Sequence, residues 1–119
     1  MFDDAPPSEL IVRQHDDVTV VRINTEQLNG ILEVQRVSAA IANVIDTSRW
    51  GKVILDLKRI RFFSSAGLGM LIEMTQRAKA RGGKLVISHP EHVMPMIKVS
   101  RMDRLLNLAD DPKAASKMF

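Results

Sequence analysis

Cysteine is absent from this 119-residue sequence, which excludes a disulfide framework and a thiolate metal site. Tyrosine is also absent, and aromatic residues make up only 4% of the chain. Nucleic-acid surfaces commonly stack bases on aromatic side chains that stand beside basic ones. Because the sequence has no basic-aromatic alternation, we expect no nucleic acid among the partners.

Long hydrophobic runs are missing as well. None approaches the roughly 20 apolar residues that a membrane-spanning helix needs, and the acidic, proline-containing start MFDDAPPSEL is unlike a secretory signal. We therefore expect a cytoplasmic protein without a membrane partner. A chain of this length, with 45% hydrophobic residues, is expected to form one domain over residues 1–119. Its core is expected over about 8–109, and the tail 110–119 is expected to be frayed or a weak helix.

Acidic charge is scarce in the second half of the chain. Residues 1–60 carry seven basic and nine acidic side chains, whereas residues 61–119 carry ten basic and five acidic ones. A basic half can meet an acidic partner surface or a nucleotide phosphate, or it can simply be the solvated face of helices. The sequence leaves these alternatives open.

Hydrophobic periodicity predicts strands that alternate with helices. Runs of β-branched residues are typical of strands, and apolar residues at three- and four-residue steps are typical of helices. The predicted elements, in chain order, are two strands around a turn at His15–Asp17, a helix from Gly30 to Thr47, a strand at Lys52–Leu57, a helix from about Ser65 to Arg81 that ends at Gly82-Gly83, a strand at Lys84–Ser88, a weaker helix containing Pro95, and a last turn and edge strand within DRLLNL.

This order predicts an α/β fold with a mixed sheet of four to five strands and helices mainly on one face. Strands joined through helices should run parallel, while the N-terminal hairpin adds an antiparallel pair. The interior strand that ends at Leu57 should be covered on both faces. The core is expected to include Val53, Leu55, Leu57, Leu68, Leu71, Ile72, Leu85 and Ile87.

Residues for catalysis are sparse. The histidines His15, His89 and His92 fall in turns or loops, and no carboxylate cluster completes a metal set with them. Neither a Gly-x-Ser-x-Gly elbow nor a Walker-type loop occurs. Asp56 ends a strand, where a carboxylate can cap the next turn as readily as act as a base. We expect no enzyme, metal or cofactor; a small phosphate-binding enzyme that uses a helix start as its anion site is an alternative.

The stretch FFSSAGLG, residues 62–69, places two serines at the start of the second predicted helix. The first N–H groups of a helix have no intrahelical partner, and the helix dipole adds partial positive charge there. A serine can cap these groups, which contributes about 1 kcal/mol, or the same groups can stabilise a phosphate. Gly67 and Gly69 keep the helix surface thin, so that another protein can approach closely.

The stretch VILDLKRIRFFSSAGLGMLIEMTQRAKARGGKLVIS, followed by VSRMDRLLNL, resembles the STAS domain of anti-sigma-factor antagonists over about residues 8–109. That family typically shows an apolar strand ending in Asp-Leu, then Asp-Ser-Ser-Gly-Leu-Gly at a helix start, and Gly-Gly before the next strand. The family's phosphoacceptor serine falls on Ser65, and its following serine falls on Ala66. Gly67, Leu68 and Gly69 match directly, and the aspartate before the acceptor falls on Ser64.

The resemblance implies a bacterial signalling protein that acts in transcription regulation without being an enzyme. Unmodified, such an anti-anti-sigma factor binds an anti-sigma factor that is also a serine kinase; phosphorylation at Ser65 blocks binding, and a serine phosphatase restores it. Ser64 would act as the helix cap. The expected partner surface consists of Gly67, Gly69, Met70, Met74 and Arg77, although the two methionines can instead cover a neighbouring element.

The sequence departs from the family pattern at several positions. Ser64 replaces an acid, Glu26 and Glu33 are the acids nearest to another typical acidic position before the first helix, and Pro95 interrupts a helix that the family usually continues. These departures keep an alternative open: an unphosphorylated STAS scaffold or adaptor in a multi-protein signalling or transport-associated complex. The sigma factor, the signal and the oligomeric state stay open.

Overall fold

A computed structural model of the chain describes residues 9–119. Its main sheet has five strands in the order β1-β2-β4-β6-β7, of which β1 and β2 are antiparallel and the other neighbours are parallel. The predicted mixed α/β sheet is therefore confirmed. The bounds of these strands are Leu10–His15 (β1), Val18–Ile23 (β2), Lys52–Asp56 (β4), Lys84–Ser88 (β6) and Leu108–Ala109 (β7).

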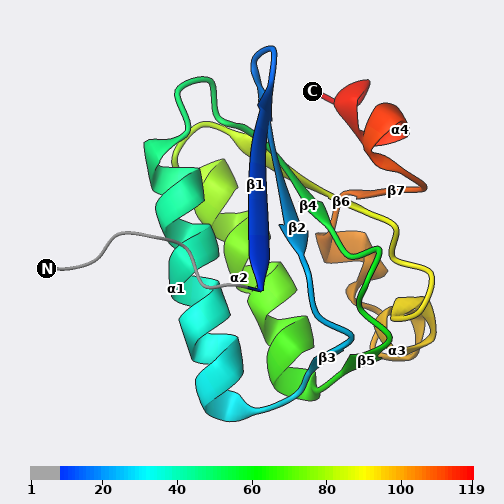
Figure 1. The fold of residues 1–119 in the computed structure, drawn as a ribbon. Coiled ribbons are helices and arrows are strands. Elements are labelled where there is room, and N and C mark those ends of the chain that lie inside the picture. Colours follow the sequence, from blue (N-terminus) through cyan, green and yellow to red (C-terminus); the bar gives the residue numbers. More distant parts are fainter. Residues whose placement is uncertain (1–8) are drawn as a thin grey trace, which may run out of the picture.

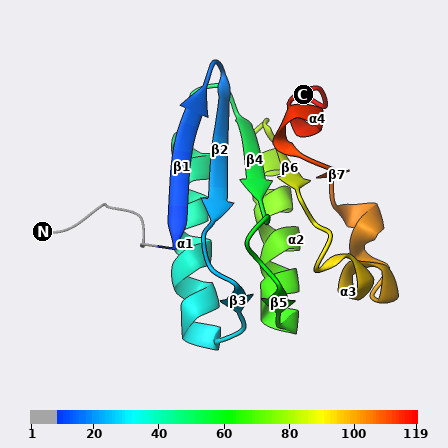
Figure 2. The same ribbon diagram turned by 45° about the vertical axis from the view of Figure 1, so that its right-hand side comes forward.

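A second, two-stranded sheet was not predicted. Strand β3 (Gln27–Leu28) pairs in parallel with β5 (Phe62–Phe63). These strands are too short to give a periodic signal in the sequence, and each precedes a long helix. The small sheet thereby brings the beginnings of these two helices to the same end of the molecule, the lower end in Figures 1 and 2.

The helices lie mainly on one face of the main sheet, as predicted. Helix α1 (Ile31–Thr47) and helix α2 (Ser65–Ala80) run side by side over that face (Figures 1 and 2). Helix α3 (Met94–Val99), the short 3₁₀-helix η1 (Met102–Leu105) and helix α4 (Pro112–Ser116) follow β6. Pro95 lies in the first turn of α3, where the missing N–H is tolerated, so it begins a helix and does not interrupt one.

The core forms between the sheet and the helix pair. Of the eight predicted core residues, all but Ile72 are buried, and Ile72 is partly buried against the same cluster. Helix α1 buries Val34, Val37 and Ile41 at helical spacing, together with Ile45.

The C-terminal tail covers the second face of the sheet. The Asp111 carboxylate accepts a hydrogen bond from the Ala114 N–H at 2.7 Å and so caps α4. Ala115 is buried against Val18, Ile54 and Val86, on the side of the sheet opposite α1 and α2 (Figure 1). Of the two alternatives for the tail, the weak helix is therefore correct, and the interior strand is covered on both faces as expected.

Arg101 gives a first testable prediction, because it adopts a left-handed backbone conformation (φ 60°, ψ 26°). A residue with a Cβ atom in this region is strained by about 1–3 kcal/mol. Glycine removes this strain, but its greater flexibility in the unfolded chain offsets part of the gain in stability. We expect Arg101→Gly to raise the free energy of unfolding by about 0.5–1 kcal/mol in urea denaturation. Arg101→Ala should give no gain; an equal gain in both variants would assign the effect to the side chain.

Candidate functional site

Ser64 fixes the beginning of α2. Its backbone is extended (φ −85°, ψ 170°), and its Oγ accepts a hydrogen bond from the Gly67 N–H at 3.3 Å. Its carbonyl oxygen accepts from the Leu68 N–H at 3.1 Å, and its own N–H donates to the Leu28 carbonyl at 3.3 Å. Ser64 is therefore the N-cap of α2, and it also ties this helix to β3.

Ser65 is the first residue of α2 and is exposed. The N–H groups of Ser65 and Ala66 donate no hydrogen bond to any atom of residues 9–119. Because the dipole of a 16-residue helix places partial positive charge at this end, a phosphate group here would meet two unpaired donors. The arrangement suits a negatively charged group near Ser65.

The two glycines of the expected partner surface differ in role. A Cβ atom on Gly67 would lie 3.1 Å from three ring atoms of Phe63, and Gly67 is buried. Its small size lets β5 pack against α2, so it does not face a partner. Gly69 is exposed, and a Cβ atom there would meet nothing within 4 Å. Gly69 thus remains part of an accessible helix surface.

Met70 and Met74 belong to the core. Each side chain is only 2% exposed, within the cluster between the sheet and the helix pair. Helix α2 packs against α1, β6, β5 and η1, so its buried sector is wider than the stripe that the sequence predicted. The prediction that these methionines face a partner is wrong, and the alternative that they cover neighbouring elements is correct.

Arg77 is exposed but is held by α1. Its Nε and Nη2 atoms donate to the two carboxylate oxygens of Asp46 at 2.9 and 2.6 Å. These hydrogen bonds hold the pKa of the Asp46 carboxyl below its ordinary value, and they raise the pKa of Arg77. Arg77 therefore clamps α2 to α1, and its charge is already balanced by a carboxylate.

We define an apolar rim by Ile31 and Leu32, the first two residues of α1, and Phe62, the first residue of β5. Figures 1 and 2 show that α1 begins, and β5 leads into α2, at the same end of the molecule. These side chains are 69%, 80% and 61% exposed. Exposed large apolar side chains gathered at one place mark interaction surfaces. Sequence reasoning missed the rim, although the sequence held two signals of it. Neither Ile31 nor Leu32 is on the inward stripe of α1. Adjacent strand residues face opposite sides, so Phe62 and Phe63 cannot both be buried on one side.

The two glutamates noted in the sequence lie near the same end. Glu26 and Glu33 line a shallow polar hollow together with Arg59. The Glu26 carboxylate is 3.9 Å from Arg61 Nε, and both side chains of this pair are exposed. The N-cap position of α2 is occupied by Ser64 and not by one of these acids.

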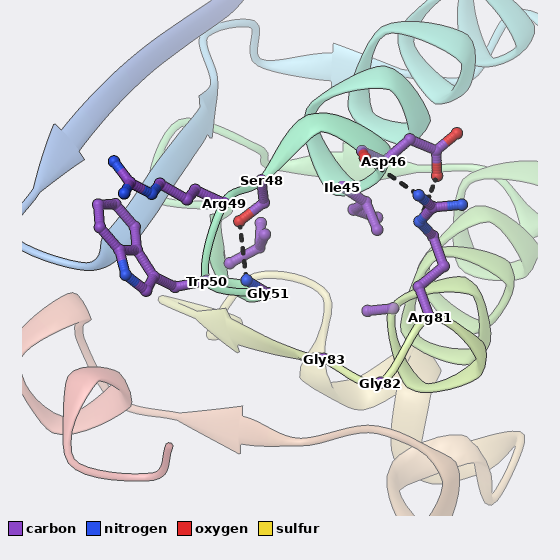
Figure 3. A pocket seen from close by; sticks show the side chains of 11 residues that line it. Ile45, Asp46, Ser48, Arg49, Trp50, Gly51, Arg81, Gly82 and Gly83 are labelled. Carbon is purple, nitrogen blue, oxygen red and sulfur yellow. Dashed lines mark hydrogen bonds and ion pairs between the residues drawn. The ribbon is translucent and has the colours of Figure 1, made fainter.

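A second hollow, of about 290 Å³, opens where α1 and α2 end. Figure 3 shows that its polar groups are directed at one another: Arg81 Nε lies 3.4 Å from the Asp46 carboxylate, and the Gly51 N–H donates to Ser48 Oγ at 3.2 Å. The Arg49 guanidinium lies 5.1 Å from the centre of the Trp50 ring. These contacts hold the helix ends together, and the one carboxylate of the hollow is already paired with arginine.

Asp56 is a buried carboxylate, but its hydrogen bonds are structural. It accepts from Arg22 Nε at 2.9 Å, from the Lys58 N–H at 3.2 Å and from Ser88 Oγ at 3.3 Å. The carboxylate thus caps the turn after β4, which is one of the two roles that the sequence left open.

Residues 9–119 offer neither a metal site nor a membrane-spanning helix. No three histidine, aspartate or glutamate side chains of this part of the chain come together in a way that could hold a metal ion. Its helices are also too short or too polar for any of them to span a membrane.

Comparisons with known proteins agree with this architecture. A sequence model of the family described as "Mlab, STAS domain" matches residues 11–107. An anti-sigma factor antagonist from Mycobacterium paratuberculosis is similar in fold, with 22% identity, a TM-score of 0.74 and coverage of 92% of this chain and 91% of that one.

Two further solved structures have the same fold. One is an anti-sigma-factor antagonist (STAS) domain protein from Planctomyces limnophilus, with 20% identity, a TM-score of 0.74, and coverage of 92% of this chain and 97% of that one. The other is the Bacillus cell fate determinant SpoIIAA in its phosphorylated form, with 18% identity, a TM-score of 0.67, and coverage of 92% and 99%. At these identities the likeness concerns the fold.

Proposed function

Since this chain belongs to the STAS domain family, we propose that it is an anti-sigma-factor antagonist. In this role it is a bacterial cytoplasmic binding module without catalytic activity. It binds an anti-sigma factor that is also a serine kinase and thereby frees a sigma factor for transcription. Phosphorylation of Ser65 releases the partner, and a serine phosphatase reverses the release.

The observation that carries this proposal is the environment of Ser65. Its hydroxyl is exposed at the first position of α2, beside two backbone N–H groups without a partner in the described chain, and the apolar rim lies at the same end of the molecule. A kinase can reach this hydroxyl without unfolding the helix. An apolar partner surface can also dock around it.

The chemistry of a switch follows from this arrangement. A phosphate on Ser65 adds a charge of about −1.5 to −2, and the two N–H groups and the helix dipole favour that charge. The fold should therefore tolerate the modification. A partner that buries the rim, in contrast, would have to remove water from the phosphate, which costs free energy unless the partner supplies cations. Binding should weaken for that reason.

We expect Ser65→Asp to fold normally and to bind the anti-sigma partner at least about tenfold more weakly, a loss of about 1.4 kcal/mol. Ser65→Ala should bind as the natural chain does and should resist modification. The partner is captured from the native cell with the tagged natural chain and identified by mass spectrometry. Affinities of the variants are then measured by titration against that purified partner.

The matched control is Ser64→Ala, which removes the neighbouring hydroxyl. This variant should lose about 1 kcal/mol of stability because the cap is removed, yet it should still be phosphorylated on Ser65. Incubation with the captured kinase and ATP, followed by mapping of the phosphate by mass spectrometry, decides the matter. Phosphate on Ser64 would contradict the assignment of the acceptor.

A second candidate function is a STAS scaffold or adaptor that binds its partner constitutively. It is favoured by Ser64, which stands where the family pattern has a carboxylate next to the acceptor. In that case no phosphate would be found on either serine, and Ser65→Asp would keep its partner. The captured protein would then belong to a larger complex and would not be a kinase.

A further inference from the structure

A groove lies between the second half of α2 and η1, and we name it the α2–η1 groove. Its volume is about 480 Å³. Buried Leu85 and Leu106 contribute to its floor. The residues that line it are Thr75, Gln76, Lys79, Gly83, Lys84, Leu85, Arg104, Leu105, Leu106 and Asn107.

The charged side chains that line this groove are all positive. Lys79, Lys84 and Arg104 line it, and none of its lining residues is acidic. Lys84 Nζ donates to the Met118 carbonyl at 2.8 Å, whereas Lys79 and Arg104 are exposed and form no ion pair with any of residues 9–119. The hollow where α1 and α2 end differs, because its lining includes a carboxylate, that of Asp46, which pairs with Arg77 and Arg81.

An apolar component accompanies these cations. Leu105 is 55% exposed at the edge of the groove. Leu105 is followed by Leu106, which is buried in the same lining. The groove therefore presents one exposed aliphatic side chain, Leu105, together with the exposed cations Lys79 and Arg104.

We propose that the α2–η1 groove binds an extended acidic segment of a partner protein, one in which carboxylates flank an aliphatic side chain. The carboxylates would pair with Lys79 and Arg104, and the aliphatic side chain would pack against Leu105. A groove of this volume admits a few side chains and not a folded domain. The positive charge of the groove favours a negatively charged segment over a positively charged one, and it accelerates the association of that segment.

This surface is separate from the Ser65 surface. Lys79 follows Ser65 by 14 residues along α2, which corresponds to about 21 Å at the rise of an α-helix. A single chain can therefore hold a partner at each surface. The inference does not depend on phosphorylation of Ser65, and the Ser65→Asp variant should bind an acidic segment as well as the natural chain does.

The probe is a dye-labelled synthetic peptide in which glutamates flank a pair of leucines, titrated into the full chain and followed by fluorescence anisotropy. We expect salt-dependent binding that is at least about tenfold weaker in the double variant K79E/R104E. The matched control K113E/K117E makes the same charge change in α4 and at the residue that follows it, and it should bind as the natural chain does. Leu105→Ser, at an exposed position, should also weaken binding, and urea denaturation should find all these variants folded.

Four outcomes would overturn the proposal. Equal weakening by K113E/K117E would assign binding to net charge alone, and equal binding of a peptide with lysine in place of glutamate would exclude charge recognition. Sedimentation with phosphatidylserine vesicles that is lost in K79E/R104E, without peptide binding, would assign the surface to anionic lipid. Self-association that is lost in Leu105→Ser, again without peptide binding, would assign it to a second copy of the chain.

Discussion

Replacing Met74 by glutamate is expected to lower the free energy of unfolding by at least about 4 kcal/mol, because an ionised carboxylate without a partner is costly to bury. Met74 is 2% exposed within the core cluster. Domains of this size are commonly stable by only about 5–15 kcal/mol, so much of the variant should be unfolded. Circular dichroism and the urea midpoint measure the effect.

Leu32→Glu is the matched control for this prediction. Leu32 is exposed in the first turn of α1, where a negative side chain is favourable to the helix dipole. Its stability should change by less than about 0.5 kcal/mol, while its binding to the anti-sigma partner should be lost because the charge lies in the apolar rim. A Met74→Glu variant that folds normally would mean that the placement of α2 on the core is incorrect.

Replacing Gly83 by alanine is expected to cost about 3 kcal/mol of stability, the upper end of the usual cost of overpacking. A Cβ atom on Gly83 would lie 2.9 Å from the Gly51 Cα and still closer to the Gly51 carbonyl oxygen. That carbonyl accepts the Lys84 N–H at 2.8 Å at the beginning of the β4–β6 pairing. The backbone of Gly51, which lies beside Gly83 in Figure 3, therefore cannot move aside without breaking this bond.

Gly82→Ala is the control that separates the steric clash at Gly83 from the cost of placing a Cβ atom on a residue with positive φ. Gly82 has a φ of +82°, but a Cβ atom there would meet nothing within 4 Å. Only the left-handed conformation is then penalised, at about 1–2 kcal/mol. Urea denaturation of the two variants should rank Gly83→Ala as the more destabilised. Equal losses would mean that the two glycines serve only to end α2, as the sequence alone suggested.

The amino-acid sequence determined the order of the main elements, the parallel pairing of the inner strands and the cap at Ser64. These features depend on residues close together in the chain. The β-branched alternation of β2 and the three- and four-residue spacing of α1 identify each element by itself. A serine before a helix needs only the N–H groups of the next turn, and the Gly67 N–H at 3.3 Å provides one.

Tertiary structure alone decided which sides of each helix and strand are buried and which stay accessible to a partner. Helix α2 contacts elements on several sides, so Met70 and Met74 are buried although they lie outside the predicted stripe. Gly67 has no room for a side chain because Phe63 of β5 packs against it, and Gly83 has none because the backbone of Gly51, distant in the sequence, approaches it. The apolar rim and the α2–η1 groove likewise combine residues from separate segments. Sequence periodicity reports the neighbours of a residue along its own helix or strand, and it carries no information on which other element packs against it.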